Sequence, residues 1–206
     1  MRKVAVSRGQ KVCGLLLLCL SVVACRKLPT PPPSQSRGAS SAQDAYRQPQ
    51  RLIAALRLTP GDVVAEVGAG GGYLTRLLAR AVGPTGQVVA TDIDGAALAA
   101  LRERAQAEGL SQIQTRLVTA TEPGLEPGRY QLILLAQVDH LLGDRAAYLR
   151  ALLPALSEAG RIAVSNREQH LTALCQAAAA AQLTCQSVKV ELPGQFLVEL
   201  KRVGQD

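Results

Sequence analysis

The stretch of sequence that decides the fold is DVVAEVGAGGGY, residues 62–73. Its first six residues are mainly apolar or β-branched, a composition that is typical of a buried strand. The next five include four glycines, which allow a tight turn and let a ligand approach the backbone without meeting a Cβ atom. A helix is expected from Gly72, and its first N–H groups have no partner inside the helix. The stretch therefore predicts a strand, a ligand-binding loop and a helix in succession.

After residue 44 the chain alternates between apolar runs of strand length and helical segments. Five β–α alternations favour right-handed crossovers and a mainly parallel sheet, and Pro193-Gly194 predicts a turn that closes a C-terminal hairpin. We therefore expect an α/β fold with a doubly wound, Rossmann-like sheet and an antiparallel hairpin strand at its end. The expected strands are 62–67, 87–92, 112–118, 130–136, 161–165, 184–192 and 195–202, and the expected helices are 45–58, 72–81, 94–108, 144–156 and 167–182.

The first 43 residues predict an export signal followed by a linker. Residues 1–11 form a basic leader and residues 12–24 are almost wholly apolar, a run too short for the ~30 Å hydrocarbon core of a bilayer. The residues Val22-Val23-Ala24-Cys25 resemble a bacterial lipobox, and this resemblance implies that Cys25 is lipidated after cleavage. An ordinary cleaved signal and an uncleaved inner-membrane anchor are the alternatives. Residues 25–43 form a Pro/Ser-rich linker, so the expected domain covers residues 44–206.

The net charge of +7 comes from the N-terminal 43 residues alone. They hold seven basic residues and no acidic one, whereas the remainder holds 16 of each. A neutral domain lacks the basic surface of a protein that binds a phosphate backbone, and the four tyrosines, one phenylalanine and no tryptophan offer few rings for stacking bases. We therefore expect no nucleic-acid partner, and we expect the lipid at the N-terminus to provide the contact with a membrane.

The glycine loop indicates a nucleoside ligand in preference to a dinucleotide. The dinucleotide pattern requires glycine at its first, third and sixth positions, which here are Gly68, Gly70 and Tyr73. Tyr73 replaces the glycine that lets the helix pack closely over a pyrophosphate, which disfavours a nicotinamide-dependent oxidoreductase. Asp92 ends the next expected strand, 20 residues after Gly72. A carboxylate at that place can accept hydrogen bonds from both hydroxyls of a ribose.

These residues resemble the first two motifs of the class I S-adenosylmethionine-dependent methyltransferases. Residues 66–72, EVGAGGG, are similar to the first motif and Asp92 to the second, and similarity to a group of small bacterial methyltransferases extends over residues 44–202. The resemblance implies a seven-stranded sheet whose last strand is antiparallel, and S-adenosylmethionine as the cofactor. It places Glu66 near the methionyl amino group, Asp92 at the ribose hydroxyls and Ile93 against the adenine. The cofactor-binding residues that it implies are Glu66, Gly68, Ala69, Gly70, Gly72, Asp92 and Ile93.

The half of the domain that would bind the methyl acceptor departs from the family pattern. Residues 118–121, VTAT, lack the acidic residue that usually follows the third strand, and Gln131 stands where the fourth strand usually opens with an aspartate. Asp139 and His140 replace a pair of histidines and are the catalytic candidates, with His140 as the base because its ordinary pKa is near neutral. The alternative is that His140 only packs or caps the next helix.

The expected domain holds two cysteines, Cys175 and Cys185, which fall in an expected helix and at the start of an expected strand. Spacing alone does not bring them within bonding geometry, so we expect two buried thiols, with a disulfide as the alternative. The chain has two histidines and no Cys/His cluster, so we predict no metal site.

The sequence as a whole predicts an S-adenosylmethionine-dependent methyltransferase anchored at the cell envelope, with a small-molecule or lipid-linked acceptor. The alternative is a catalytically inactive lipoprotein whose methyltransferase-like domain binds a ligand or a partner. Both readings stay open because the cofactor is made in the cytoplasm, whereas the signal would export the domain away from it.

Overall fold

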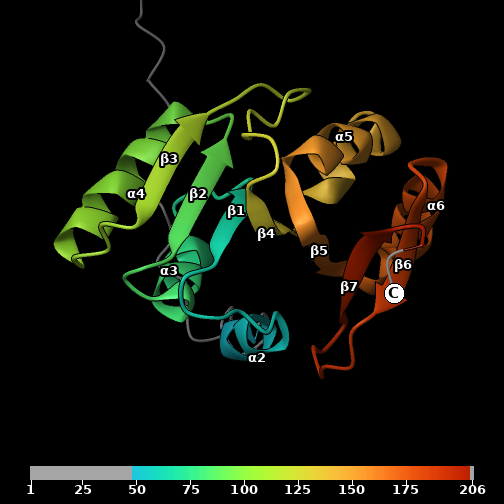
Figure 1. Cartoon of the computed structure of the whole chain (residues 1–206), viewed down its shortest axis with the longest axis horizontal. Coiled ribbons are helices and arrows are strands. Elements are labelled where there is room, and N and C mark those ends of the chain that lie inside the picture. Colours follow the sequence, from blue (N-terminus) through green and yellow to red (C-terminus); the bar gives the residue numbers. More distant parts are fainter. Residues whose placement is uncertain (1–47, 205–206) are drawn as a thin grey trace, which may run out of the picture. The chain divides into compact units, whose positions relative to one another are not determined.

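A seven-stranded sheet with strand order β3-β2-β1-β4-β5-β7-β6 forms the centre of the domain (Figure 1). The computed structural model describes residues 48–204. The expected signal peptide, residues 25–43 and Cys25 therefore lie outside the described residues. Strand β7 runs antiparallel to β5 and to β6, and the other neighbouring pairs are parallel, which confirms the predicted fold class. The strands are β1 (Val63–Val67), β2 (Gln87–Asp92), β3 (Ile113–Leu117), β4 (Tyr130–Ala136), β5 (Leu156–Arg167), β6 (Leu183–Ser187) and β7 (Gln195–Arg202).

Helices cover both faces of this sheet, because side chains that alternate along each strand point to opposite faces. On one face, Val64 and Leu132 pack with the buried residues of α2 and α3, and Ala90 packs against α4. On the other face, Ala65 and Ile133 pack with those of α5 and α6. The helices are α2 (Pro49–Ala55), α3 (Tyr73–Val82), α4 (Gly95–Ala107), α5 (Arg145–Leu152) and α6 (Leu171–Ala180), with 3₁₀ turns η1 (Asp139–Leu141), η2 (Leu153–Ala155) and η3 (Glu168–His170).

Several elements in the second half begin or end away from their predicted bounds. The expected helix at 144–156 ends at Leu152, because Pro154 follows within a 3₁₀ turn. Strand β5 is longer at both ends than the predicted 161–165. The helix predicted from residue 167 begins at Leu171, after the turn η3. The strand predicted at 184–192 ends at Ser187, and Leu192 is buried against the core instead of continuing the strand.

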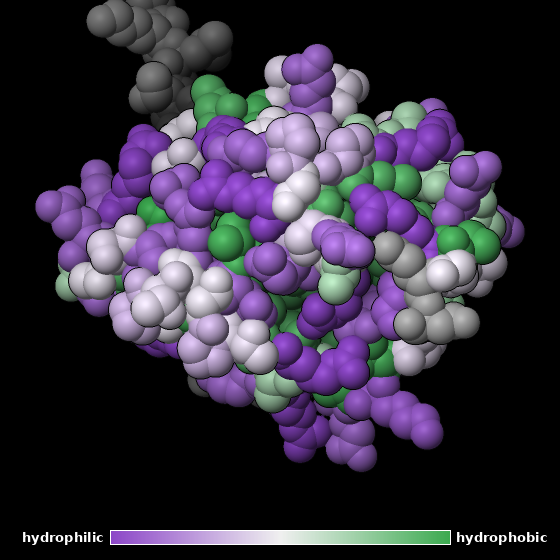
Figure 2. Space-filling model, viewed as in Figure 1, coloured by the Kyte–Doolittle hydropathy of each residue, from purple (hydrophilic) through white to green (hydrophobic). Residues whose placement is uncertain are grey.

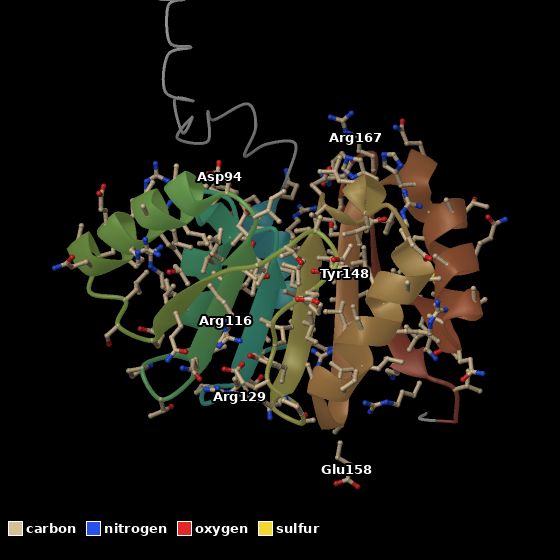
Figure 3. All side chains as sticks on the ribbon, turned by 90° about the horizontal axis from the view of Figure 1, so that it is seen from above. Asp94, Arg116, Arg129, Tyr148, Glu158 and Arg167 are labelled. Carbon is tan, nitrogen blue, oxygen red and sulfur yellow. A yellow bond between two sulfur atoms is a disulfide. The ribbon has the colours of Figure 1, made fainter. Side chains whose placement is uncertain are left out.

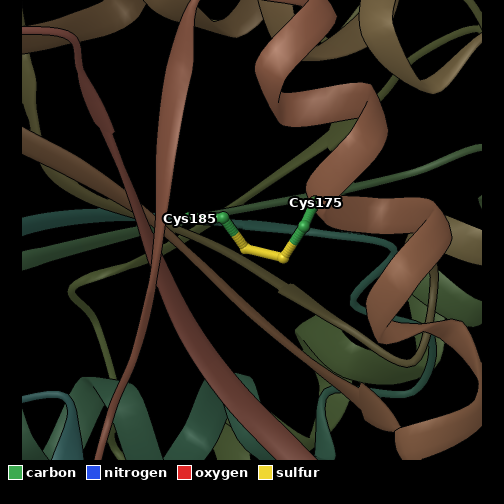
Figure 4. Close-up of a disulfide and its surroundings, with 2 residues drawn as sticks. All are labelled: Cys175 and Cys185. Carbon is green, nitrogen blue, oxygen red and sulfur yellow. A yellow bond between two sulfur atoms is a disulfide. The ribbon is translucent and has the colours of Figure 1, made fainter.

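A disulfide joins Cys175 on α6 to Cys185 on β6 (Figure 4), with 5.6 Å between the two Cα atoms. The expectation of two separate thiols is therefore wrong. A single turn connects α6 to β6, with Gln182 at a φ of 60°, so the chain folds straight back along the helix. Spacing in the sequence did not reveal this return, because it depends on where the helix ends.

The face of the domain seen in Figure 2 is mainly hydrophilic, and apolar surface shows only in small separate areas. Among the described residues no helix is both long enough and apolar enough to span a membrane.

Candidate functional site

The carboxyl ends of the parallel strands meet at one edge of the sheet. Figure 3 shows Asp94, just after β2, and Arg167, at the end of β5, toward this edge, with Arg129 at the opposite one. Strands β1 and β4 are neighbours here, and the chain crosses to opposite faces after each of them, which makes this the position where doubly wound sheets bind ligands. A cavity of about 290 Å³ lies here. Its lining residues are Val67, Gly68, Asp92, Ile93, Val118, Thr119, Ala120, Gln137, Val138, Leu141, Leu142 and Tyr148.

At two positions of the loop, a neighbouring side chain lies so close to the backbone that only glycine fits without a shift. A Cβ atom on Gly68 would lie 2.7 Å from Cγ2 of Val138, and one on Gly72 would lie 2.1 Å from Cδ1 of Leu101. Both glycines have positive φ, at 74° and 79°. Gly68 therefore brings the loop against the segment after β4, at the cavity, whereas Gly72 lets the loop pack on α4.

The carboxylate of Asp92 is held by two backbone N–H groups, one on each oxygen. Gly70 donates to Oδ2 at 2.7 Å and Asp94 donates to Oδ1 at 2.9 Å. An ionised carboxylate offers about four acceptor positions, so both oxygens keep room for one further hydrogen bond. Asp92 lines the cavity and is partly exposed. Its carboxylate is thus fixed in orientation and able to accept two ligand hydroxyls.

Glu66 lies behind the loop, in the buried part of β1, and is only 3% exposed. Thr75, on α3, donates to Oε2 of Glu66 at 2.5 Å. Burial raises the pKa of Glu66 from its ordinary 4.5 to about 7, the hydrogen bond from Thr75 opposes this rise, and the charge of Asp92 adds to it. Glu66 is therefore poised to lose its proton when a cation binds nearby.

Three of the seven predicted cofactor-binding residues line the cavity: Gly68, Asp92 and Ile93. Ile93 is 65% exposed, a large apolar side chain at the edge of the cavity. Gly70 orients Asp92 through its N–H group. The other three, Glu66, Ala69 and Gly72, are not among the lining residues, so their contact with a cofactor stays a prediction.

The two catalytic candidates lie in the turn η1, just beyond β4. Asp139 is 1% exposed: Asn166 donates to its Oδ1 at 2.5 Å, and Nε of Arg145 lies 3.6 Å from its Oδ2. Arg145 also donates to the backbone oxygen of Asp139 at 2.9 Å. Asp139 is therefore not a solvated loop carboxylate. It holds the turn, and a catalytic contact of its side chain stays a prediction.

His140 is half-buried and contacts two other elements. Its Nδ1 lies 2.9 Å from Nδ2 of Asn166 at the end of β5, and its ring stacks on His170 of η3 with 4.6 Å between the ring centroids. The pKa of His140 lies below its ordinary value because burial disfavours the charged ring, and the neighbouring His170 adds to this effect.

Sequence reasoning missed two polar residues at this edge, Gln137 and Asn166. Gln137 lines the cavity with a φ of 59°, and its Nε2 donates to Oε1 of Gln195 at 2.9 Å. Asn166 is fully buried and contacts both catalytic candidates. Each residue stands at or just after the end of a buried strand, β4 or β5. This position in the sequence is the signal that would have indicated them.

Comparison with known proteins agrees with this geometry. The family model described as "Methyltransferase domain" matches residues 64–160. The match covers slightly less than half of the chain, and it spans β1 to β4, the glycine loop and the start of β5. Two ubiquinone/menaquinone biosynthesis C-methyltransferases resemble the chain in sequence. The one from Ectopseudomonas mendocina (strain ymp) is 30% identical over 106 residues, which is 51% of this chain and 41% of the relative. The one from Legionella pneumophila (strain Paris) is 49% identical over 51 residues, 25% of this chain and 20% of the relative. The chain thus spans less than half the length of these relatives.

Solved structures share the fold of this domain. An S-adenosylmethionine-dependent methyltransferase from Aquifex aeolicus superposes with a TM-score of 0.73 at 18% identity, covering 79% of this chain and 93% of that one. The [4+2]-cyclase SpnF superposes with a TM-score of 0.65 at 15% identity, covering 82% and 85%. At these identities the likeness establishes the fold alone. The family match agrees with the predicted type of domain, and the solved structures confirm the predicted fold.

Proposed function

We propose that the chain transfers a methyl group from S-adenosylmethionine to a small-molecule or lipid-linked acceptor. The observation that carries this proposal is the orientation of Asp92. Two backbone N–H groups fix its carboxylate at the wall of the cavity, and each oxygen keeps an acceptor position that supports a role in binding the two hydroxyls of a ribose. The glycine loop that supplies one of these groups also keeps the cavity free of a side chain at Gly68.

The residues present fit the cofactor. Asp92 would accept hydrogen bonds from the ribose hydroxyls, Ile93 would cover the adenine, and Thr119 would stand where related domains place an acid. Glu66, a buried carboxyl with a pKa of about 7, would balance the ammonium of the methionyl part from behind the loop. The cofactor supplies an electrophilic methyl group on a sulfonium sulfur, so the protein's task is to position a nucleophile in line with the bond that breaks.

The acceptor would approach over an apolar wall. The cavity residues that follow β4 are mainly apolar, and Leu141 among them is 72% exposed. Burial raises the pKa of Tyr148, which also lines the cavity, to about 12, so its hydroxyl stays neutral and offers one donor. Exposed apolar side chains at a cavity favour an apolar acceptor. The relatives are named for ubiquinone and menaquinone biosynthesis, which supports an acceptor with a lipid chain.

We further propose that the chain works at the cell envelope, anchored through a lipid on Cys25. The leader, the apolar run and the lipobox-like residues support this location. The disulfide between Cys175 and Cys185 supports it independently, because disulfides persist in oxidising compartments outside the cytoplasm.

Titration calorimetry on the full chain in detergent tests the proposed site. We expect S-adenosylmethionine and S-adenosylhomocysteine to bind with micromolar affinity, and Asp92→Asn to weaken both by at least about tenfold, since hydrogen bonds to a charged group contribute about 1.5–3 kcal/mol each. The matched control is Asp94→Asn, two residues away, because asparagine caps a helix as well as aspartate does. Its affinities should stay within about twofold of the unchanged protein.

Other outcomes separate the candidate functions. An equal loss of affinity in Asp92→Asn and Asp94→Asn would mean that the carboxylate of Asp92 does not hold the nucleoside. A well-folded chain that binds neither ligand would favour the alternative, a methyltransferase-like module that captures a partner without catalysis. The fold alone does not decide for methyl transfer, since SpnF shares it and is named a [4+2]-cyclase.

A further inference from the structure

Asn166 is a buried junction between the catalytic candidates and the backbone of β5. Its Oδ1 accepts a hydrogen bond from the backbone N–H of Arg167 at 2.8 Å. Its Nδ2 lies 2.5 Å from Oδ1 of Asp139 and 2.9 Å from Nδ1 of His140. Asn166 is fully buried, so its side-chain amide makes its hydrogen bonds to these three protein partners and not to solvent.

These partners determine which end of the amide faces His140. A backbone N–H group can only donate, so the atom of Asn166 that faces Arg167 has to be its oxygen. A carboxylate accepts, so the atom that faces Asp139 has to be the NH₂ group. The two requirements agree, and they direct the second hydrogen of Nδ2 toward Nδ1 of His140. The choice between the two amide orientations, which X-ray structures usually leave open, is settled here by the network.

The orientation of Asn166 fixes the tautomer of His140. Because Nδ1 accepts a hydrogen bond, the neutral ring carries its proton on Nε2. The charged and titratable groups around the ring are Asp139, Arg145 on α5, Arg167 on β5 and His170 on η3. Asp139 favours a charged ring, while the other three and burial oppose it. The ring therefore has no free lone pair with which to take a proton from an acceptor.

We propose that Asn166 is a positioning residue that holds His140 as a neutral hydrogen-bond donor, whose Nε2–H group would meet an oxygen atom of the methyl acceptor. His140 is not among the residues that line the cavity, but Leu141, the next residue in the chain, is. The sequence alone predicted a base at His140. A donor suits an acceptor that carries an electron-rich oxygen, such as a phenolate, an enolate or a carboxylate, and that needs no proton removed by this residue. The role of His140 toward a methyl acceptor rests on the proposed function. The protonation of its ring can be measured without any methyl transfer.

Nitrogen-15 NMR of the imidazole nitrogens tests the tautomer directly. The chain has two histidines, so the variant His170→Gln leaves His140 as the only imidazole and completes the assignment. In the full chain at pH 7 we expect His140 to show a protonated Nε2 and an unprotonated Nδ1. A protonated Nδ1, or a doubly protonated ring, would overturn the proposal whether or not the protein transfers methyl groups.

Exchanging two side chains gives a second test that preserves total charge. In the double variant Asp139→Asn/Asn166→Asp, the carboxylate faces Nδ1 and can only accept, so the ring proton should move to Nδ1. The pKa of His140 should rise by at least one unit, which is a tenfold gain in proton affinity. The same tautomer before and after the exchange would show that Asn166 does not set it. S-adenosylhomocysteine binding should stay within twofold in the double variant, which separates this result from a failure of the cofactor site.

A small oxyanion can test whether the Nε2–H group of His140 donates a hydrogen bond. We expect acetate, as a simple oxyanion, to shift the Nε2 resonance of His140 in a saturable manner, and acetamide to shift it much less at equal concentrations. In the exchanged variant, at a pH well above the raised pKa of His140, the neutral ring carries its proton on Nδ1, and acetate should lose this effect. No shift with acetate in the unchanged protein would overturn the assignment of Nε2 to the acceptor side.

Discussion

Glu66 gives the domain a stability that depends on pH. Its carboxyl is favoured in the protonated form when folded, with a pKa of about 7 against about 4.5 when exposed. The folded state therefore binds more protons between these values, and the free energy of unfolding falls as pH rises from about 4.5 to about 7, by roughly 3 kcal/mol in total. Glu66→Gln keeps a partner for Thr75 and removes this fall. Denaturant unfolding at pH 4.5 and pH 8 should show the variant gaining about 3 kcal/mol relative to the unchanged protein between the two pH values.

Glu103→Gln, on the exposed face of α4, is the matched control for this experiment, and its difference from the unchanged protein should be the same at both pH values. If Glu66→Gln also gives a constant difference, the carboxyl does not titrate in this range. The same group should make S-adenosylmethionine bind more tightly at pH 8 than at pH 6, because the ammonium pairs with the ionised carboxylate.

At the residue scale, the sequence predicts some positions and not others. Asp92 could be predicted, because the end of a strand and the distance from a glycine loop are both visible along the chain. The surroundings of Asp139 could not be predicted. Its burial depends on Arg145 and Asn166, which belong to two other elements and approach it only after α5 and β5 pack together. The donor state of His140 depends on the same contacts.

The junction between the glycine loop and α4 should be sensitive to a single methyl group. Gly72→Ala would place a Cβ atom 2.1 Å from Leu101 while keeping a φ of 79°. Gly128 has a similar φ of 67° and nothing within 4 Å of a Cβ atom, so Gly128→Ala carries the backbone strain alone. We expect Gly128→Ala to cost about 1 kcal/mol and Gly72→Ala about 2–4 kcal/mol in denaturant unfolding. Equal losses would mean that Leu101 moves aside at no cost.

The disulfide between α6 and β6 should stabilise the end of the sheet that lies away from the cavity. It closes a short loop with a sequence separation of 10, for which the chain-entropy model gives about 3 kcal/mol. A reductant should therefore lower the Tm of the unchanged protein by roughly 6–12 °C, at about 2–4 °C per kcal/mol. The double variant Cys175→Ser/Cys185→Ser should begin at the lower Tm and show no response. A reductant effect of equal size in the variant would attribute the change to something other than this bond.

At the element scale, periodicity predicted where strands and helices occur but not where they stop. The centre of β4 is a run of apolar residues, and β1 and β2 were predicted to within a residue or two. The errors gather after Asp144, where ends are set by tertiary contacts. The burial of Leu192 ends β6 early, and the pairing of β5 with β7 carries β5 through Arg167.

The whole chain combines a charged N-terminal region with a neutral domain, and lipidation is the prediction that belongs to this scale. We expect a fatty-acid analogue supplied to cells to label the full chain, and Cys25→Ala to remove the label. Cys19→Ala is the matched control, because residue 19 lies within the apolar run and should leave labelling unchanged. No label on the unchanged chain would favour one of the two other kinds of N-terminal signal, and labelling that survives Cys25→Ala would attribute the lipid to another residue.

The architecture as a whole could be predicted because the handedness of β–α–β crossovers leaves few arrangements for five alternations. The form of the cavity wall beyond β4 could not be predicted. It depends on the turn η1 and on the exposure of Leu141, and the sequence showed neither.

The close approach of Gly68 to Val138 also restricts the order in which the two loops can change. A side chain at Gly68 would lie 2.7 Å from Cγ2 of Val138, so the space between the loops holds one of the two side chains but not both. A lineage, or a laboratory library, that adds bulk to the glycine loop at Gly68 must first reduce the side chain at position 138. Val138→Ala removes the approach at 2.7 Å and leaves one of 3.0 Å to Cβ of residue 138, so Gly68→Ala then needs only a small shift besides the strain of its positive φ. Changes at Val138, in the wall of the cavity, would therefore precede, and permit, changes in the glycine loop.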